Sequence, residues 1–176
     1  MKIAILGYSG SGKSTLARRL GEQYGIPVLH LDRVQFLPGW RERDPEEGRA
    51  MTEAFMHQDT WVIEGNYFKF YQEERLAQAD RIVILTFPRL TCLIRAYKRY
   101  RKYRGRTRED MADGCEEKID AAFLWWILHE GRDRRHRRHF REIRKRYPDK
   151  TVVLQNQRQL DRFFKDSASP WISMKK

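Results

Sequence analysis

The sequence predicts a single α/β domain built around a parallel β-sheet. Five short segments rich in Ile, Val and Leu are separated by helix-like stretches, which is the pattern of consecutive βαβ units. None of these segments alternates strictly between apolar and polar residues, as expected when helices cover both faces of the sheet. A chain of 176 residues suits one domain with a sizeable core. We therefore expect residues 1–176 to form one domain.

The elements are expected in the following order. The strands are predicted at Lys2–Leu6, Val28–Asp32, Thr60–Glu64, Arg81–Phe87 and Thr151–Leu154. The first helix follows the first strand and ends near Tyr24, because Gly25 and Pro27 oppose its continuation. A second helix is predicted over Pro45–His57, with proline in its first turn. Two apolar stripes with helical spacing are interpreted as core contacts: residues 90, 93, 94, 97 and 100, and residues 119, 122, 123, 126 and 127.

Composition excludes several classes of protein. The longest apolar runs are far shorter than the roughly 18 to 20 residues of a membrane span, and no signal-peptide pattern opens the chain. The two cysteines, Cys92 and Cys115, lie far apart and form no zinc-binding or disulfide pattern. We expect a soluble, cytoplasmic protein with no membrane partner.

Positive charge is concentrated in two segments. The chain has 36 Lys and Arg against 24 Asp and Glu, a formal net charge of +12. Residues 89–108 hold nine basic residues and no acid, and residues 132–146 hold nine against two acids, so the rest of the chain is net acidic. Such segments suit phosphate-bearing ligands, nucleic acid or a solvated helix face.

The decisive motif is a phosphate-binding loop. Residues 7–14 read Gly-Tyr-Ser-Gly-Ser-Gly-Lys-Ser, which matches the Walker A pattern directly between a predicted strand and a predicted helix. Glycines let the backbone approach an oligophosphate, and the N–H groups of residues 10–15 are expected to face it. Lys13 would contact the β- and γ-phosphates of ATP, and Ser14 would bind Mg²⁺. The predicted nucleotide-binding residues are Gly7, Ser9, Gly10, Ser11, Gly12, Lys13, Ser14 and Thr15.

Two carboxylates end neighbouring strands of the predicted sheet. Asp32 and Glu64 should both face the loop, because ligands of such sheets bind at the carboxyl ends of the strands. We assign Asp32 to the acceptor, as a catalytic base or orienting group, and Glu64 to the magnesium ion, although the two roles can be exchanged. Alternatively, Asp32 only caps a turn. His30 is interpreted as a core histidine.

The remaining candidates lie on predicted loops. Arg104, Arg106 and Arg108 surround a glycine and would form a lid that neutralises the transferring phosphoryl group; the alternative is a solvated helix end. Trp40 and Asn66 could line an acceptor pocket, with core packing equally compatible for Trp40. Residues 132–146 are interpreted either as a solvated helix or as a nucleic-acid contact.

The chain resembles the bacterial DNA topology modulation (FlaR-related) family of P-loop kinases, which is related to adenylate and shikimate kinases. The matching segments include the phosphate loop, Leu29–Asp32, Leu37–Trp40, Trp61–Tyr67 and Tyr103–Cys115. The resemblance implies a three-layer P-loop NTPase fold, a five-stranded sheet of order 2-3-1-4-5, an ATP site, a helical acceptor-side segment at 33–60 and a lid at 104–116. The family more often has Asp at the position of Glu64.

Three functions are compatible with these residues. The first is an ATP- and Mg²⁺-dependent phosphotransferase acting on a small acceptor such as a nucleotide or nucleoside. The second is an ATP-regulated protein that binds nucleic acid through residues 89–108 and 132–146. The third is an NTPase without a specific acceptor. The sequence favours the first.

Overall fold

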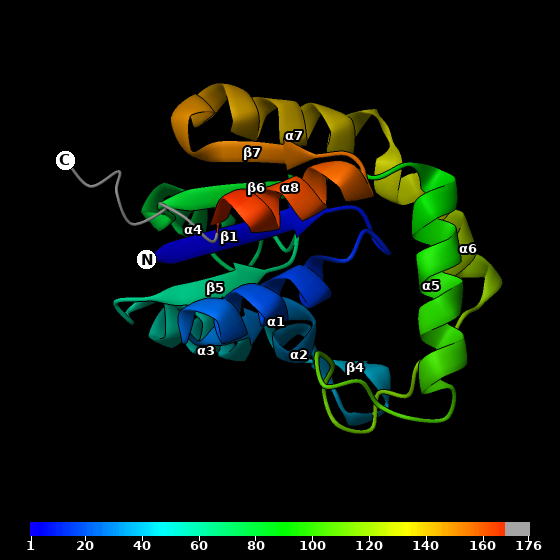
Figure 1. Cartoon of the computed structure of the whole chain (residues 1–176). Helices are drawn as coiled ribbons and strands as arrows, with labels where there is room; N and C mark the ends of the chain where they lie inside the picture. The colour runs from blue at the N-terminus through cyan, green and yellow to red at the C-terminus, as the bar shows by residue number, and fades with distance from the viewer. Residues whose placement is uncertain (168–176) are drawn as a thin grey trace.

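The computed structural model describes residues 1–167 and shows a parallel sheet between two layers of helices (Figure 1). The strands of this sheet are β1 (Lys2–Gly7), β2 (Val28–His30), β5 (Trp61–Glu64), β6 (Arg81–Leu85) and β7 (Thr151–Leu154). Their spatial order is β2-β5-β1-β6-β7. Counted along the chain within this sheet, the order is 2-3-1-4-5, which confirms the predicted topology.

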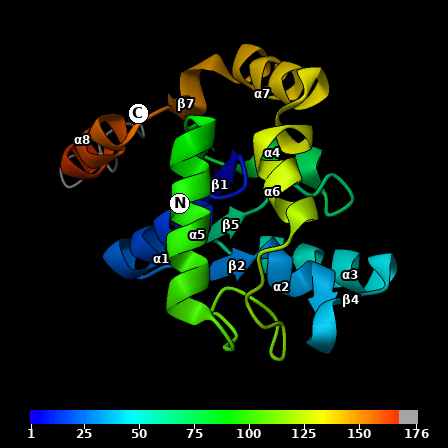
Figure 2. The same ribbon diagram turned by 90° about the vertical axis from the view of Figure 1, so that its right-hand side faces the viewer.

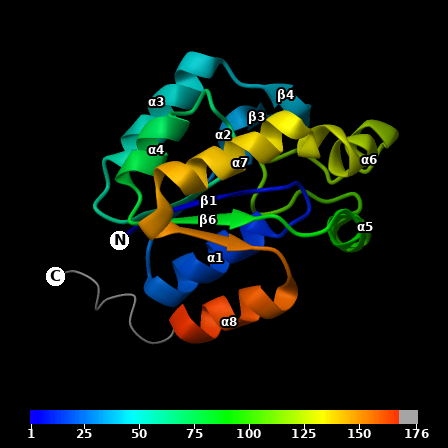
Figure 3. The same cartoon turned by 90° about the horizontal axis from the view of Figure 1, so that it is seen from above.

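Helices cover both faces of the sheet, as the uninterrupted apolar strands predict. Figure 3 shows α1 (Lys13–Tyr24) and α8 (Gln157–Ser167) on one face, and α3 (Pro45–Met56), α4 (Gln72–Gln78) and α7 (Arg134–Arg146) on the other. The central strand β1 pairs with β5 and β6, so that Ile3 lies beside Val62 and Ile5 beside Val83. These four side chains are fully buried and form the centre of the core.

Two helices stand at the carboxyl edge of the sheet. Figure 2 shows α5 (Arg89–Tyr103) crossing in front of the strand ends, with α6 (Ala121–Leu128) beside it. The segment after β2 holds α2 (Leu31–Gln35) and a hairpin of β3 (Phe36–Leu37) and β4 (Arg41–Glu42). Short 3-10 turns occur at Pro38–Trp40, Glu130–Arg132 and Pro148–Lys150. No helix among the described residues is long and apolar enough to cross a membrane.

Several predicted boundaries need correction. The second strand ends at His30 instead of Asp32, because the chain turns into α2 at Leu31. The fourth strand ends at Leu85, two residues early, because Pro88 precedes α5. The Thr60 strand begins at Trp61, the first strand runs to Gly7, and the helix predicted to end at His57 ends at Met56.

Most of the apolar stripe at residues 90–100 is not a core contact, although Leu93 packs against the main core. Leu90, Ile94 and Tyr97 are between 54% and 69% exposed, whereas Cys92 and Ala96 on the adjacent face are fully buried. Because α5 lies across the sheet edge, Cys92, Ala96 and Leu93 pack inward, whereas Leu90, Ile94 and Tyr97 face outward. The second stripe is mixed: Ile127 is buried, and Trp126 is 39% exposed.

Candidate functional site: a phosphate loop with two carboxylates

The phosphate loop joins β1 to α1 at the carboxyl edge of the sheet. Gly10 and Gly12 have φ angles of +75° and +98°, in the left-handed region that favours glycine. A Cβ on Gly10 would lie 2.5 Å from the carbonyl oxygen of Cys92 in α5. The path of the loop therefore needs glycine at Gly10 both for its dihedral angles and for its contact with α5.

The N-terminus of α1 is prepared to bind an anion. The amide of Leu16 donates the first helical hydrogen bond to Gly12 O, so the amides before it have no helical acceptor. No acidic side chain lies in the first turn. The amide of Ser11 differs from the prediction for residues 10–15, because it donates to Tyr8 O at 3.1 Å and closes the loop instead.

Polar groups of the loop itself fit a phosphate ligand. Lys13 Nζ lies 3.4 Å from Tyr8 O, folded back over the loop. The hydroxyl of Ser11 is buried and has no hydrogen-bond partner among the described residues. Such an orphaned hydroxyl and a mobile lysine beside unpaired amides are groups that an oligophosphate would satisfy.

Glu64 and Ser14 meet at the end of β5. The hydroxyl of Ser14 donates to Glu64 Oε1 at 3.0 Å, and His30 Nδ1 lies 3.0 Å from the same oxygen. Glu64 is only 2% exposed, which makes these partners necessary for an ionised carboxylate. A hydroxyl and a carboxylate in contact are the usual protein ligands of a magnesium ion whose other ligands are phosphates and water. The residues present thus fit Mg²⁺.

His30 belongs to this site rather than to a purely apolar core. Its position at the end of β2, paired in register with Glu64, brings its ring to the carboxylate. The residue pair on neighbouring parallel strands is the signal that could have revealed this contact from the sequence.

Asp32 lies on the first turn of α2, not on a strand, yet its side chain faces the loop. The hydroxyl of Tyr67 donates to Asp32 Oδ1 at 2.7 Å. Burial, followed by the nearby charge of Glu64, raises the pKa of Asp32, while Tyr67, Lys13 and Arg108 act in the opposite direction. The structure therefore brings Asp32, Glu64 and Lys13 into one electrostatic environment.

The side chain of Asn66 is hydrogen-bonded to the backbone at the start of the phosphate loop. Its Oδ1 accepts a hydrogen bond from Gly7 N at 3.0 Å, and its Nδ2 donates to Gly7 O at 2.8 Å. Both groups of the amide are engaged with the backbone, so Asn66 is placed to support the loop. Its predicted contact with an acceptor stays a prediction.

The predicted lid follows the C-terminus of α5, but its arginines differ in their surroundings. Arg104 and Arg106 are exposed. Arg108 is only 8% exposed and forms ion pairs of 2.5 Å with both Asp110 and Glu117. Glu117 also pairs with Arg99 at 2.7 Å. In this arrangement the charge of Arg108 holds the lid together, and the catalytic role of the three lid arginines stays a prediction.

Asp110 is a site residue that the sequence did not single out. Burial alone would raise the pKa of its carboxyl, yet Arg108, a hydrogen bond with Ser14 and the nearby His30 hold it below its usual range. The predicted lid segment thus reaches the Ser14 hydroxyl of the phosphate loop.

Trp40 connects the β3–β4 hairpin to the lid. Its indole Nε1 donates to Glu116 O at 3.0 Å, and its ring lies edge-on to Phe36 with 5.3 Å between ring centroids. It packs against a small separate core that includes Met111 and Cys115 of the lid. Trp40 therefore packs within this cluster. Its predicted contact with an acceptor stays a prediction.

Comparison with known proteins supports the fold. No protein-family model and no curated protein matches the chain. Among solved structures, shikimate kinase from Acinetobacter baumannii, in complex with shikimate, has a TM-score of 0.57 at 16% identity, covering 93% of this chain and 89% of that one. TT1252 from Thermus thermophilus has a TM-score of 0.55 at 17% identity, covering 96% of both chains. The chain shares the α/β fold of these solved structures, a five-stranded parallel sheet flanked by helices.

Proposed function

We propose that the protein is an ATP- and Mg²⁺-dependent phosphotransferase that acts on the hydroxyl or phosphate of a small acceptor, such as a nucleoside or nucleotide. The observation that carries this proposal is the meeting of Ser14, Glu64 and Asp32 beside the phosphate loop. Binding of a nucleotide alone needs Ser14 and one carboxylate, Glu64. Transfer of a phosphoryl group also needs a group that acts on the acceptor, and the second carboxylate, Asp32, is suited to that task.

The residues divide into two functional sides. On the nucleotide side, the α1 amides and Lys13 would hold the β- and γ-phosphates, while Ser14 and Glu64 would hold Mg²⁺, which supplies charge neutralisation of the phosphates. On the acceptor side, Asp32 would orient or deprotonate the attacking group. The raised pKa of Asp32 brings a carboxylate closer to the range in which it is an effective base.

The lid supplies further positive charge. Arg104 and Arg106 are free of carboxylate partners among residues 1–167, and they are exposed on the segment that follows α5. Closure of this segment would bring their guanidinium groups to the transferring phosphoryl group. We keep residues 104–116 as the lid and 33–60 as the acceptor-side segment, and we place the chain with the FlaR-related kinases on the resemblance of its motifs.

The proposal is tested by ATP consumption with a panel of acceptors. Purified protein would be supplied with nucleosides, nucleotides and small hydroxylated metabolites, with Lys13→Ala as the blank. We expect at least one acceptor to stimulate ADP formation above the acceptor-free rate, and the stimulation to vanish in Lys13→Ala. ATP use that no acceptor stimulates would instead indicate a plain NTPase.

The alternative, an ATP-regulated nucleic-acid-binding protein, is supported by fewer free charges than the sequence suggests. Arg95 donates to Ser11 O, Arg99 pairs with Glu117, and Arg132 is buried. The exposed arginines of α7 are still available to contact nucleic acid. Binding of duplex DNA that falls steeply between low and moderate salt, while acceptors have no effect on ATP use, would favour it.

A further inference from the structure

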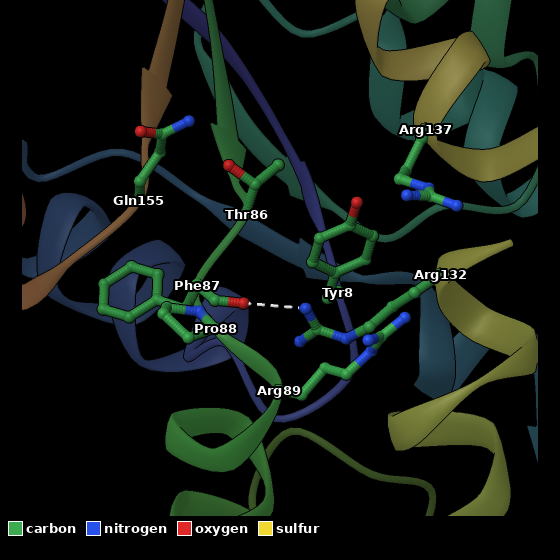
Figure 4. A pocket seen from close by; sticks show the side chains of 8 residues that line it. All are labelled: Tyr8, Thr86, Phe87, Pro88, Arg89, Arg132, Arg137 and Gln155. Carbon is green, nitrogen blue, oxygen red and sulfur yellow. Dashed lines mark hydrogen bonds between the residues drawn. The ribbon is translucent and has the colours of Figure 1, made fainter. Parts of the chain in front are cut away.

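A second group of positive charges surrounds a pocket on the α7 side of the sheet edge. The pocket has a volume of about 400 Å³ and lies where β6 and β7 end, between the start of α5 and α7 (Figure 4). Its walls include Arg89, Arg132 and Arg137. Tyr8 of the phosphate loop and Gln155, which follows β7, also line it.

The three arginines come from three separate segments. Arg89 is the first residue of α5, Arg132 ends a 3-10 turn, and Arg137 lies on α7. No Asp or Glu lines the pocket, and none of the three forms an ion pair with a carboxylate within residues 1–167. Three like charges around one space repel one another, and a bound anion would relieve that repulsion.

Arg132 is the least exposed of the three and has an unused donor. The side chain is 6% exposed; its Nε donates to Ile127 O at 2.9 Å and its Nη1 to Phe87 O at 2.8 Å. The guanidinium carbon lies 4.0 Å from the centroid of the Tyr8 ring. Its Nη2 is buried without a hydrogen-bond partner among the described residues. A buried cationic N–H without an acceptor is costly, and an anion in the pocket would supply one.

Other groups of the walls agree with this reading. The hydroxyl of Thr86 is also buried and without a partner in the described part of the chain. Burial raises the pKa of Tyr8, while Arg132, Arg137 and Arg89 all oppose that rise, which places the three charges around one hydroxyl. The N-terminus of α5 adds its partial positive charge at Arg89.

We propose that this pocket is a second anion-binding site, which binds the phosphate group of a small phosphorylated molecule through Arg89, Arg132 and Arg137. Guanidinium groups match the oxygens of a phosphate with paired donors, which favours phosphate over a simple halide. The volume suits a small molecule rather than a polymer. Tyr8 is the second residue of the phosphate loop, so occupation of the pocket would act on a neighbour of the ATP site. The proposal is independent of which acceptor the protein uses.

The test measures phosphate binding in proteins that carry Lys13→Ala, which weakens the loop as a competing site. Arg132 is left intact, because it also holds Phe87 and Ile127 in place. We compare Arg89→Gln/Arg137→Gln with a control that removes equal charge from exposed positions of α7, Arg141→Gln/Arg144→Gln. Inorganic phosphate is titrated calorimetrically at constant ionic strength, and circular dichroism checks that each variant is folded.

We expect the Arg89→Gln/Arg137→Gln pair to raise the Kd for phosphate at least about tenfold, and the control pair to leave it within about twofold. A parallel titration with phenyl phosphate separates the two sources of the group: tighter binding than inorganic phosphate indicates a phosphate ester, and equal binding indicates the free ion. An equal rise in the Kd for phosphate in both variant pairs would show that only the overall positive charge matters, which would overturn the site. Unchanged binding in the Arg89→Gln/Arg137→Gln pair, or no binding to the parent protein, would overturn the site.

Discussion

The carboxylate of Glu64 shows how one residue can unite three parts of the chain. One of its oxygens is shared by Ser14 of α1 and His30 of β2. Because the residue is almost fully buried, these hydrogen bonds compensate for much of the lost hydration of its charge. With a proton on Nδ1, the His30 ring donates to this same oxygen.

Replacing this carboxylate by an amide of the same shape should weaken the use of magnesium. In Glu64→Gln we expect the Mg²⁺ concentration for half-maximal activity to rise by about 10- to 100-fold, as is typical when a group that supports a metal is lost. The measurement is a magnesium titration of the initial rate at saturating ATP. Glu64→Asp, which keeps the charge, should lie between the two proteins; an unchanged magnesium dependence in Glu64→Gln would contradict the assignment.

The hydroxyl of Tyr67 should control the pH at which Asp32 can act. This hydroxyl donates to Asp32 and favours its ionised form, so its removal in Tyr67→Phe should raise the pKa of Asp32 further. A base that must be ionised is then lost at a higher pH, and the acidic limb of the kcat/KM profile should move upward. Tyr147→Phe, far from the site, is the matched control. A profile unchanged by Tyr67→Phe would count against Asp32 as the base.

The lid and the β3–β4 hairpin meet in a small cluster that is separate from the main core, with Trp40 packed against Met111 and Cys115. A backbone bond from Gly39 N to Gly114 O, at 3.2 Å, adds to it. Such a satellite cluster can open without unfolding the sheet.

Removing the Trp40 side chain should loosen the lid selectively. In Trp40→Ala we expect amides of residues 104–117 to lose protection in hydrogen exchange, while those of β1 and β6 keep theirs, because the main core is unaffected. Trp40→Phe keeps an aromatic ring but not the bond to Glu116 O, and should have a smaller effect. Equal loss of protection in lid and sheet would show that the cluster is not an independent unit.

What the sequence could predict depended on the range of the interactions. The first strand, α1 with its end at Tyr24, and the phosphate loop follow from local patterns, and the structure agrees closely. The contact of Asn66 with Gly7, and of Arg132 with Tyr8, join residues that no local pattern relates. The prediction that the α5 stripe is a core contact holds for Leu93 but is wrong for Leu90, Ile94 and Tyr97, because helical spacing finds an apolar face but not what covers it.

At the scale of the whole molecule, part of the positive charge behind the net +12 is paired within the fold. Within residues 89–108, Arg95, Arg99 and Arg108 are bound to the backbone or to carboxylates of the protein itself. Exposed positive charge remains on α7 and also at the end of α5 and in the segment after it, at Lys98, Arg101, Lys102, Arg104 and Arg106. The exposed positive charge therefore lies on two parts of the fold, α7 and the C-terminal end of α5 with the segment that follows it.

Helix α5 has a mechanical consequence. Near its start it contacts the phosphate loop, through the Cys92 carbonyl at Gly10 and through Arg95 on Ser11 O; at its end, about 12 to 17 Å further along, it leads into the predicted lid. A rigid helix that contacts the phosphate loop near one end and leads into the predicted lid at the other couples the positions of the two. We expect ATP and acceptor to bind synergistically, each tightening the other by the same factor. Calorimetric titration of each ligand with and without its companion would measure that factor, and a value of one would show that α5 transmits nothing.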